Sequence, residues 1–193
     1  MQLEPGVLEN RLVRLEPLAD RHREGLRAAC DADPELWERL YSFAMHGAHF
    51  EAGWAWLTGE VAAGRAIAFA VMTEGRCRGM TSFLAIEAPH AKAEIGATYY
   101  EPSARGGPVN PAAKRLLLDH AFAAGARRIY LHVDALNARS RAAVLKLGAV
   151  QEGMLRHDRV VWTGRIRDTV VFSVLAGEWP KVRAGLDARL AGY

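Results

Sequence analysis

The stretch from residue 94 to residue 122 constrains the fold of this 193-residue chain more than any other part. Residues 94–100 are rich in β-forming side chains, and residues 101–110 have the composition of a turn. Residues 111–122 then carry apolar side chains at helical spacing. The pattern predicts a strand, a glycine-containing loop and a helix in direct succession.

The loop and the start of the predicted helix have the features of an anion site. Asn110 before Pro111 is typical of a helix N-cap and first turn, because Asn caps free amides and proline has no N–H to leave unpaired. Free amides, the positive end of the helix dipole and the nearby Arg105 favour a phosphate or pyrophosphate. The amides concerned are those of Gly106, Gly107, Val109 and the first helical turn. A glycine turn before a helix is also a common structural element, so the motif alone leaves both interpretations open.

Length and composition predict one ordinary globular domain over residues 1–193, with half of the residues apolar. The N-terminus lacks the pattern of a signal peptide, and the longest apolar run, residues 66–72, is too short to span a bilayer. A cytoplasmic protein with no membrane partner is therefore expected. The net charge of +3 is small and the arginines are scattered, so no nucleic-acid surface is predicted.

No metal site is predicted. Cys30 and Cys77 lack metal-ligand spacing and have the surroundings of buried thiols. His46 and His49 are three residues apart, but no acidic or cysteine partner completes a ligand set. These histidines lie instead in an irregular, aromatic segment near the predicted second helix, and such segments often cover substrate pockets. Candidates for contacts with a substrate in such a pocket are Tyr41, Phe43, His46 and Trp54.

The rest of the chain predicts a mixed sheet flanked by helices, an α/β (α+β) fold. A helix joins the strand at 94–100 to the strand at 128–134, so these two strands are expected to be parallel. The other strands follow hairpin-like turns and are expected to be antiparallel. Strand-like segments lie at 12–17, 66–72, 77–86, 94–100, 128–134, 149–161 and 165–175, and helix-like segments at 20–32, 50–64, 137–147 and the C-terminal tail.

In this order of elements and in several motifs, the chain resembles the GNAT superfamily of acyl-CoA-dependent N-acetyltransferases. Within that superfamily it is similar to the RimJ/RimL type, the ribosomal-protein alanine acetyltransferases. The residues that carry the resemblance are Arg14-Leu-Glu-Pro-Leu18, Glu94-Ile-Gly96, and residues 106–122, 133–143, 147–156 and 167–175. They span nearly the whole chain.

The resemblance implies a mixed, mostly antiparallel sheet of six to seven strands with a splayed parallel pair at its centre. It implies acetyl-CoA as the cofactor, with the pantetheine arm between the splayed strands beside Thr98 and Tyr99. The pyrophosphate would lie on the loop from Arg105 to Asn110, in agreement with the anion site. The usual loop pattern is Gln or Arg, two residues, Gly, one residue, then Gly or Ala. Here Ser103 replaces the basic residue and Pro108 occupies the last position, which removes one amide donor.

A second constellation, Asn137 and Ser140, has two interpretations. Asn137 is a good helix cap, with Ser140 in the first turn. The resemblance implies instead that Asn137 contacts the cofactor and that Ser140 lies near the thiol, where its hydroxyl can donate to the departing sulfur. The amine must lose a proton, and Glu94 and Asp158 are the candidate bases. Related enzymes carry a Glu where this chain has Arg159, so a water chain stays open as the proton path.

Two functions follow from the resemblance. The first is acetyl transfer from acetyl-CoA to a primary amine, either a protein N-terminus or a small molecule. The second is a catalytically silent acyl-CoA-binding module. An intact Asn137 and Ser140 pair favours catalysis, whereas the missing Glu at the expected base position favours the silent module. A homodimer is one assembly that the sequence leaves open.

Overall fold

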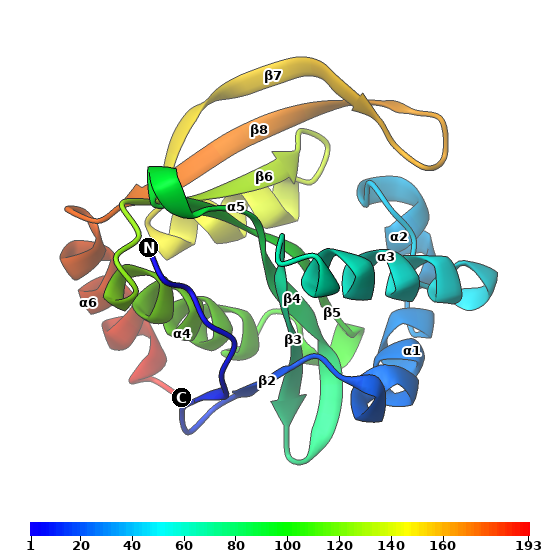
Figure 1. The fold of residues 1–193 in the computed structure, drawn as a ribbon, viewed down its shortest axis with the longest axis horizontal. Coiled ribbons are helices and arrows are strands. Elements are labelled where there is room, and N and C mark those ends of the chain that lie inside the picture. Colours follow the sequence, from blue (N-terminus) through cyan, green and yellow to red (C-terminus); the bar gives the residue numbers. More distant parts are fainter.

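The computed structural model describes residues 1–193 and contains one eight-stranded sheet in the order β1-β2-β3-β4-β5-β6-β8-β7 (Figure 1). Every neighbouring pair is antiparallel except β5 and β6. The strands are β1 (Leu8–Glu9), β2 (Arg14–Pro17), β3 (Ile67–Thr73), β4 (Arg76–Glu87), β5 (Lys92–Tyr100), β6 (Arg128–Asp134), β7 (Val150–Val160) and β8 (Ile166–Leu175).

Helices cover both faces of this sheet, and each side has its own hydrophobic core. The larger core, 29 buried residues, lies under α4, α5 and α6. The smaller core, ten buried residues around Trp37 and Tyr99, lies under α1, α2 and α3. The helices are α1 (Arg23–Asp31), α2 (Pro34–Leu40), α3 (Phe50–Ala62), α4 (Val109–Ala123), α5 (Ala138–Leu147) and α6 (Trp179–Leu190).

The parallel strands β5 and β6 stay paired over only three residue pairs, the last of which joins Glu94 to Tyr130. Beyond this point they separate. On its other side, β5 pairs with β4 through a bulge at Ala97 and Thr98, and Ala97 has a left-handed φ of 44°. A bulge bends its strand and adds local twist, so the break in the ladder turns β5 away from β6. The sheet is therefore split at its centre.

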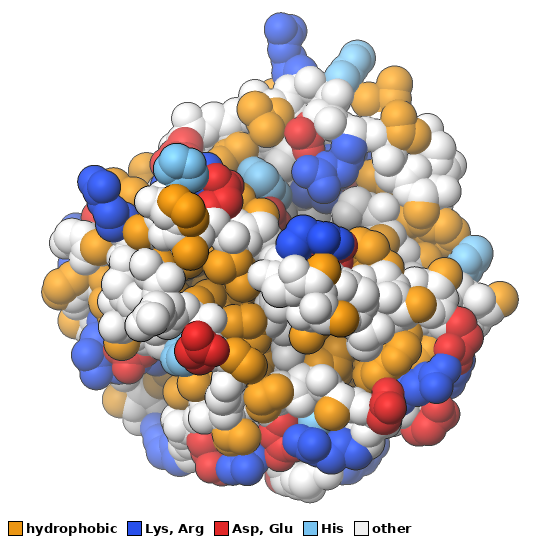
Figure 2. Space-filling view, in the orientation of Figure 1, with side chains coloured by type: hydrophobic (Ala, Val, Ile, Leu, Met, Phe, Trp, Pro, Cys, Tyr) orange, Lys and Arg blue, Asp and Glu red, His pale blue; other side chains and the backbone are white.

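The surface carries charges of both signs. On the face drawn in Figure 2, acidic and basic side chains are interspersed, with no region of one sign alone. No helix combines the length and hydropathy that crossing a bilayer requires. The turn end of the β7–β8 hairpin extends past the end of β6 (Figure 1), and most of β7 is exposed.

The predicted fold class is confirmed, with three differences in detail. The sheet has eight strands because the two-residue β1 extends it. Helix α2 lies in a segment for which no helix was predicted, although Asp33 caps it by accepting from the Leu36 amide and Pro34 opens it. The predicted N-cap of α4 is wrong: the helix begins at Val109 with Pro108 at the cap, so Asn110 lies inside the first turn. Pro111 fits there because first-turn amides have no intrahelical partner.

Candidate active site

A cavity of about 560 Å³ occupies the split between β5 and β6. Its wall is built by the second half of β5, the end of β6, the starts of α4 and α5, and the segment after α2. The backbone edges of β5 and β6 that face the split have no partner strand beyond Glu94 and Tyr130. They are therefore free to pair with a bound ligand.

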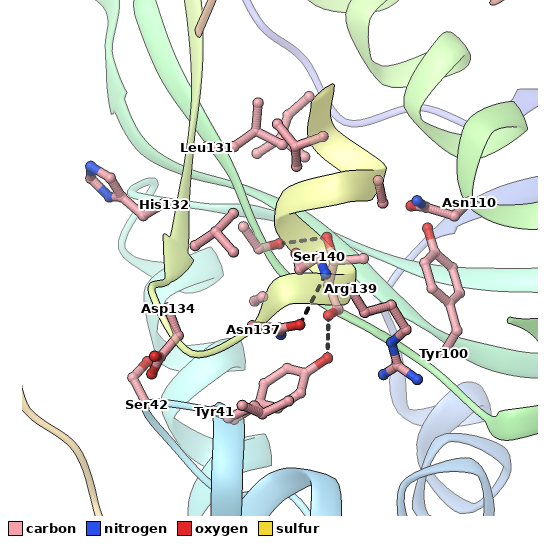
Figure 3. Close-up of a pocket in the computed structure, with 18 of the residues that line it drawn as sticks. Tyr41, Ser42, Tyr100, Asn110, Leu131, His132, Asp134, Asn137, Arg139 and Ser140 are labelled. Carbon is pink, nitrogen blue, oxygen red and sulfur yellow. Dashed lines mark hydrogen bonds between the residues drawn. The ribbon is translucent and has the colours of Figure 1, made fainter. Parts of the chain in front are cut away.

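The cavity connects the two faces of the sheet. Side chains alternate along a strand, so Leu131 and His132 point to opposite sides of β6, as Figure 3 shows. Leu131 belongs to the core under α4, α5 and α6, on the same side as Ser140. His132 faces the other side, and so does Glu94, because it is paired with Tyr130. All four side chains line the one cavity.

The loop before α4 presents amides without acceptors. The backbone N–H groups of Gly106, Gly107, Val109 and Asn110 donate no hydrogen bond within the protein, and no side chain caps the helix. Gly106 has a φ of 78°, and a Cβ added there would meet nothing within 4 Å. An uncapped helix start beside an open glycine suits a phosphate or pyrophosphate. The residues of the predicted anion site therefore fit the diphosphate of a CoA ligand.

Arg105 lines the cavity, but much of its guanidinium is already engaged. It forms an ion pair with Asp33 and donates from Nε to the carbonyl oxygen of Tyr100 at 2.7 Å. Arg105 therefore fastens the loop to β5 and to the start of α2. Tyr100 itself was not predicted as a site residue. Its hydroxyl is buried in the cavity wall without a partner, and burial raises its pKa, so it stays a hydrogen-bond donor to a ligand.

Asn137 and Ser140 both line the cavity from the start of α5 (Figure 3). The cap interpretation is confirmed, since Asn137 Oδ1 accepts from the Ser140 amide at 2.9 Å. The capping bond leaves the Asn137 amide NH₂ and the Ser140 hydroxyl free. Gly148 closes the helix in a left-handed conformation, as predicted. The two functional groups are thus held at the end of a rigid helix.

Glu94 lies in the cavity wall, and its partner is a histidine that the sequence did not reveal. Glu94 Oε2 and His132 Nδ1 are 3.0 Å apart, and both side chains are largely buried. A carboxylate on Nδ1 fixes the ring and leaves Nε2 as an acceptor, which is the arrangement a histidine base needs. Nε2 makes no hydrogen bond to the protein.

Some of the remaining predicted residues line the cavity and others do not. Thr98 lines the cavity, although its carbonyl oxygen already accepts from the Tyr41 hydroxyl at 2.7 Å. Tyr99 points the other way: its side chain is buried in the smaller core, and its hydroxyl donates to the carbonyl of Ala29 at 3.0 Å. Six of the predicted residues do not line the cavity, namely His46, Trp54, Tyr99, Gly107, Val109 and Asp158.

Asp158 does not reach the cavity because its carboxylate is held within the β7–β8 hairpin. Its Oδ2 accepts from Arg159 Nε and from Thr169 Oγ1, each at 2.8 Å. Although burial raises its pKa, these two hydrogen bonds outweigh that effect and hold the pKa below its ordinary value. A carboxylate stabilised in its charged form is a poor proton acceptor. The structure therefore gives no support to Asp158 as the base. No group of three or more His, Cys, Asp or Glu side chains is placed to hold a metal ion.

A buried lysine on α4 also lines the cavity. Lys114 is 5% exposed, has no carboxylate partner, and donates to Thr98 Oγ1 at 2.8 Å and to Thr81 Oγ1 at 3.1 Å. The two hydroxyl oxygens are themselves 2.8 Å apart. Burial lowers the pKa of Lys114 from its ordinary value of 10.5 to about 7. Its charged form is therefore costly in the free protein.

The lowered pKa of Lys114 predicts that the stability of the protein depends on pH. Its pKa is lower in the folded than in the unfolded chain, so the unfolded chain binds more protons between about pH 7 and pH 10.5. The free energy of unfolding should rise with pH across that window, by up to about 1.4 kcal/mol per pH unit from this group. Urea unfolding at pH 7, 8 and 9 should show the rise in the wild type and a flatter dependence in Lys114→Met. An equal change of the unfolding free energy with pH in the two proteins would contradict this role of Lys114.

The comparisons with known proteins agree with this geometry. Residues 12–150 match the acetyltransferase (GNAT) domain. The chain belongs to the GNAT acetyltransferase family. A candidate acetyltransferase from T. thermophilus is 41% identical, covers 98% of this chain and 100% of its own, and superposes with a TM-score of 0.87. No curated protein matches the chain at a significant level.

Two further solved structures are similar over nearly the whole chain. A GCN5-related N-acetyltransferase from Brucella melitensis is 31% identical, with a TM-score of 0.86, and the match covers 97% of this chain and 86% of the other. Mycobacterium smegmatis RimJ, solved with CoA-disulfide, is 26% identical with a TM-score of 0.80, over 97% of this chain and 93% of the other. GNAT proteins use acetyl-CoA, and this chain is an acetyl-CoA-dependent N-acetyltransferase.

Proposed function

We propose that this protein acetylates a primary amine, with the Glu94–His132 pair as its base and Ser140 as the hydrogen-bond donor to the departing thiolate. The observation that carries the proposal is the cavity through the split sheet, which Glu94 and His132 line from one face and Ser140 from the other. Bound acetyl-CoA would supply the acetyl group as a reactive thioester. The free amides at Gly106 and Asn110 and the split strands favour its binding in this cavity.

The residues on the two faces of the sheet have different roles in the proposed reaction. His132 Nε2 can accept the proton that the attacking amine must lose, while Glu94 holds Nδ1 and stabilises the imidazolium that results. On the other face, the Ser140 hydroxyl can donate a hydrogen bond to the sulfur atom as negative charge develops on it. Asn137 places Ser140 by capping the same helix. Most of the remaining catalysis would come from holding both reactants in one cavity.

The acceptor is a protein N-terminus or a small amine, in a RimJ/RimL-type enzyme. Likeness to RimJ supports the subtype, and an aromatic wall supports an acceptor of some size. Tyr41, Phe43 and Trp56 line the cavity, and the Phe43 and Trp56 rings lie 4.8 Å apart. Incubation of the protein with acetyl-CoA and a panel of N-terminal peptides, polyamines and aminoglycosides, reading free thiol, tests the proposal. CoA binding without acetylation of any amine would favour the silent acyl-CoA-binding module.

Ser140→Ala should lower kcat by about a hundredfold while CoA affinity stays nearly constant, because the donor bond strengthens only as charge builds on sulfur. Turnover at saturating acetyl-CoA and the Kd for CoA measure the two effects separately. Asn137→Ala is the variant for comparison, because it removes the cap of α5 rather than the Ser140 hydroxyl. It should lower the stability of the helix start by about 1 kcal/mol. Equal turnover for wild type and Ser140→Ala, with chemistry rate-limiting, would remove Ser140 from the mechanism.

A further inference from the structure

Two arginines lie opposite each other at the β7–β8 end of the cavity. Arg159 on β7 and Arg167 on β8 are direct cross-strand partners, and both line the cavity. Side chains of directly opposed residues point to the same face of a sheet, and like charges in that position destabilise the pair. The pairing is therefore unfavourable unless anions beside the two guanidinium groups offset it.

Arg167 is a buried cation that lacks hydrogen bonds. It is 6% exposed, its guanidinium donates no hydrogen bond to the protein, and its Nε is buried without a partner. The nearest carboxylate oxygen, Asp134 Oδ2, is 3.9 Å from Nε. That oxygen already accepts from Arg165 at 2.5 Å, and Asp134 Oδ1 accepts from the Leu136 amide. Asp134 is thus largely committed elsewhere.

The ionisation of Arg167 agrees with this incomplete pairing. Burial lowers its pKa, the field of Asp134 opposes that effect, and the field of Arg159 adds to it. Burying a guanidinium without hydrogen-bond partners is costly, and a bound anion would supply them. Arg159 has donors to spare as well, because only its Nε is engaged, with Asp158 at 2.8 Å.

We propose that Arg159 and Arg167 bind an anionic group, a carboxylate or a phosphate, on the acceptor amine. This inference rests on the proposed acetyl transfer and names the class of acceptor. Guanidinium groups suit both anions because their planar forks donate two parallel hydrogen bonds. The residue at position 159, where related enzymes are expected to carry a carboxylate base, would thus recognise the acceptor instead.

The strand register sets the separation between the amine and the anion. His132 is paired with Val171, and Arg167 lies four residues before Val171 on β8, which corresponds to about 13 Å along the strand. The guanidinium can reach back over part of that length. The acceptor should therefore carry its anionic group several bonds from the amine, as in a peptide with an acidic second residue or a small amino acid with a distant carboxylate.

Pairs of acceptors of which only one member carries an anionic group test the inference. The pairs are the C-terminal amides of Ala-Glu-Ala and Ala-Gln-Ala, 4-aminobutyrate with 4-aminobutyramide, and phosphoethanolamine with ethanolamine, so that carboxylate and phosphate are separated. The wild type should show kcat/KM about ten- to a hundredfold higher for the anionic member of at least one pair. Arg167→Met should bring that ratio close to one, and Arg167→Lys should restore part of it.

Two further variants complete the kinetic design. Arg156→Met removes an exposed arginine of β7 that does not line the cavity, and it should keep the wild-type ratio. Arg159→Met should lower the ratio as well and is available if Arg167→Met does not fold. Equal rates for charged and neutral acceptors in the wild type, or a preference that persists in both Arg159→Met and Arg167→Met, would overturn the inference while leaving acetyl transfer intact.

A binding measurement covers the case in which no amine is acetylated. Glutarate and inorganic phosphate, added with CoA present, should raise the melting temperature of the wild type, because a ligand selective for the folded state stabilises it. The shift from at least one of them should be lost in Arg167→Met and kept in Arg156→Met, with chloride at equal ionic strength as the reference. Equal shifts in all three proteins would overturn the anion site independently of activity.

Discussion

His132→Gln should lower kcat by about a hundred- to ten-thousandfold, the range associated with loss of a general base. The amide of Gln is similar in size but takes up no proton near neutral pH, so the amine loses its acceptor. The Kd for CoA should change little, because His132 faces the side of the sheet opposite Ser140. Single-turnover acetylation at saturating acetyl-CoA and calorimetric CoA titration measure the two quantities.

Two further variants complete this experiment, a control at a histidine outside the cavity and a variant of the carboxylate that pairs with His132. His90→Gln changes an exposed histidine outside the cavity and should leave turnover at the wild-type level. Glu94→Gln should also lower kcat, since Gln holds Nδ1 less well and does not stabilise the imidazolium. Turnover of His132→Gln within twofold of the wild type, with chemistry rate-limiting, would exclude the pair and leave water as the proton path.

Gly106→Val should weaken CoA binding by about a hundredfold or more, because its side chain would stand in front of the free amides that a diphosphate needs. The space over Gly106 is open now, and the residue forms part of the cavity wall. The rise in melting temperature that CoA causes should disappear in this variant. Gly107 does not line the cavity, so the same substitution there should have a smaller effect.

Gly164→Val is the control for backbone strain. Gly164 has a φ of 85°, close to the 78° of Gly106, and a Cβ there also meets nothing within 4 Å. It lies in the turn between β7 and β8, away from the cavity. Both variants should lose a similar amount of stability, but only Gly106→Val should lose CoA affinity. A Kd that is unchanged in Gly106→Val would show that the phosphate site lies elsewhere.

Local patterns predicted much of this fold. The bounds of β6 match the predicted strand at 128–134, and Asn137 and Gly148 close the two ends of α5 as predicted. The signals at these positions are short-range, since an N-cap and a glycine C-cap act within one turn. Helix α2 had such a signal in Asp33 and Pro34, but its seven residues are too few for a clear helical period.

The pairs that cross the sheet were not predictable in the same way. Glu94 and His132 are 38 residues apart and meet only because β5 and β6 run in parallel register. Arg159 and Arg167 face each other only because of the pairing between β7 and β8. Lys114 has the sequence context of a solvated helix residue. In the fold it is buried, and its amino group donates to threonines on two neighbouring strands of the sheet. Contacts of this kind depend on register, which composition and spacing do not reveal.

The opening in the middle of the sheet has a kinetic consequence. Because the cavity is lined from both faces, the two substrates can enter from opposite sides without passing each other. Neither product then blocks the exit of the other, and a complex with both substrates bound can form in either order of addition. Double-reciprocal plots of initial rate against acetyl-CoA concentration, measured at several fixed acceptor concentrations, would therefore give intersecting rather than parallel lines. A single molecule that joined a CoA moiety to an acceptor would thread through the sheet and occupy both entrances at once.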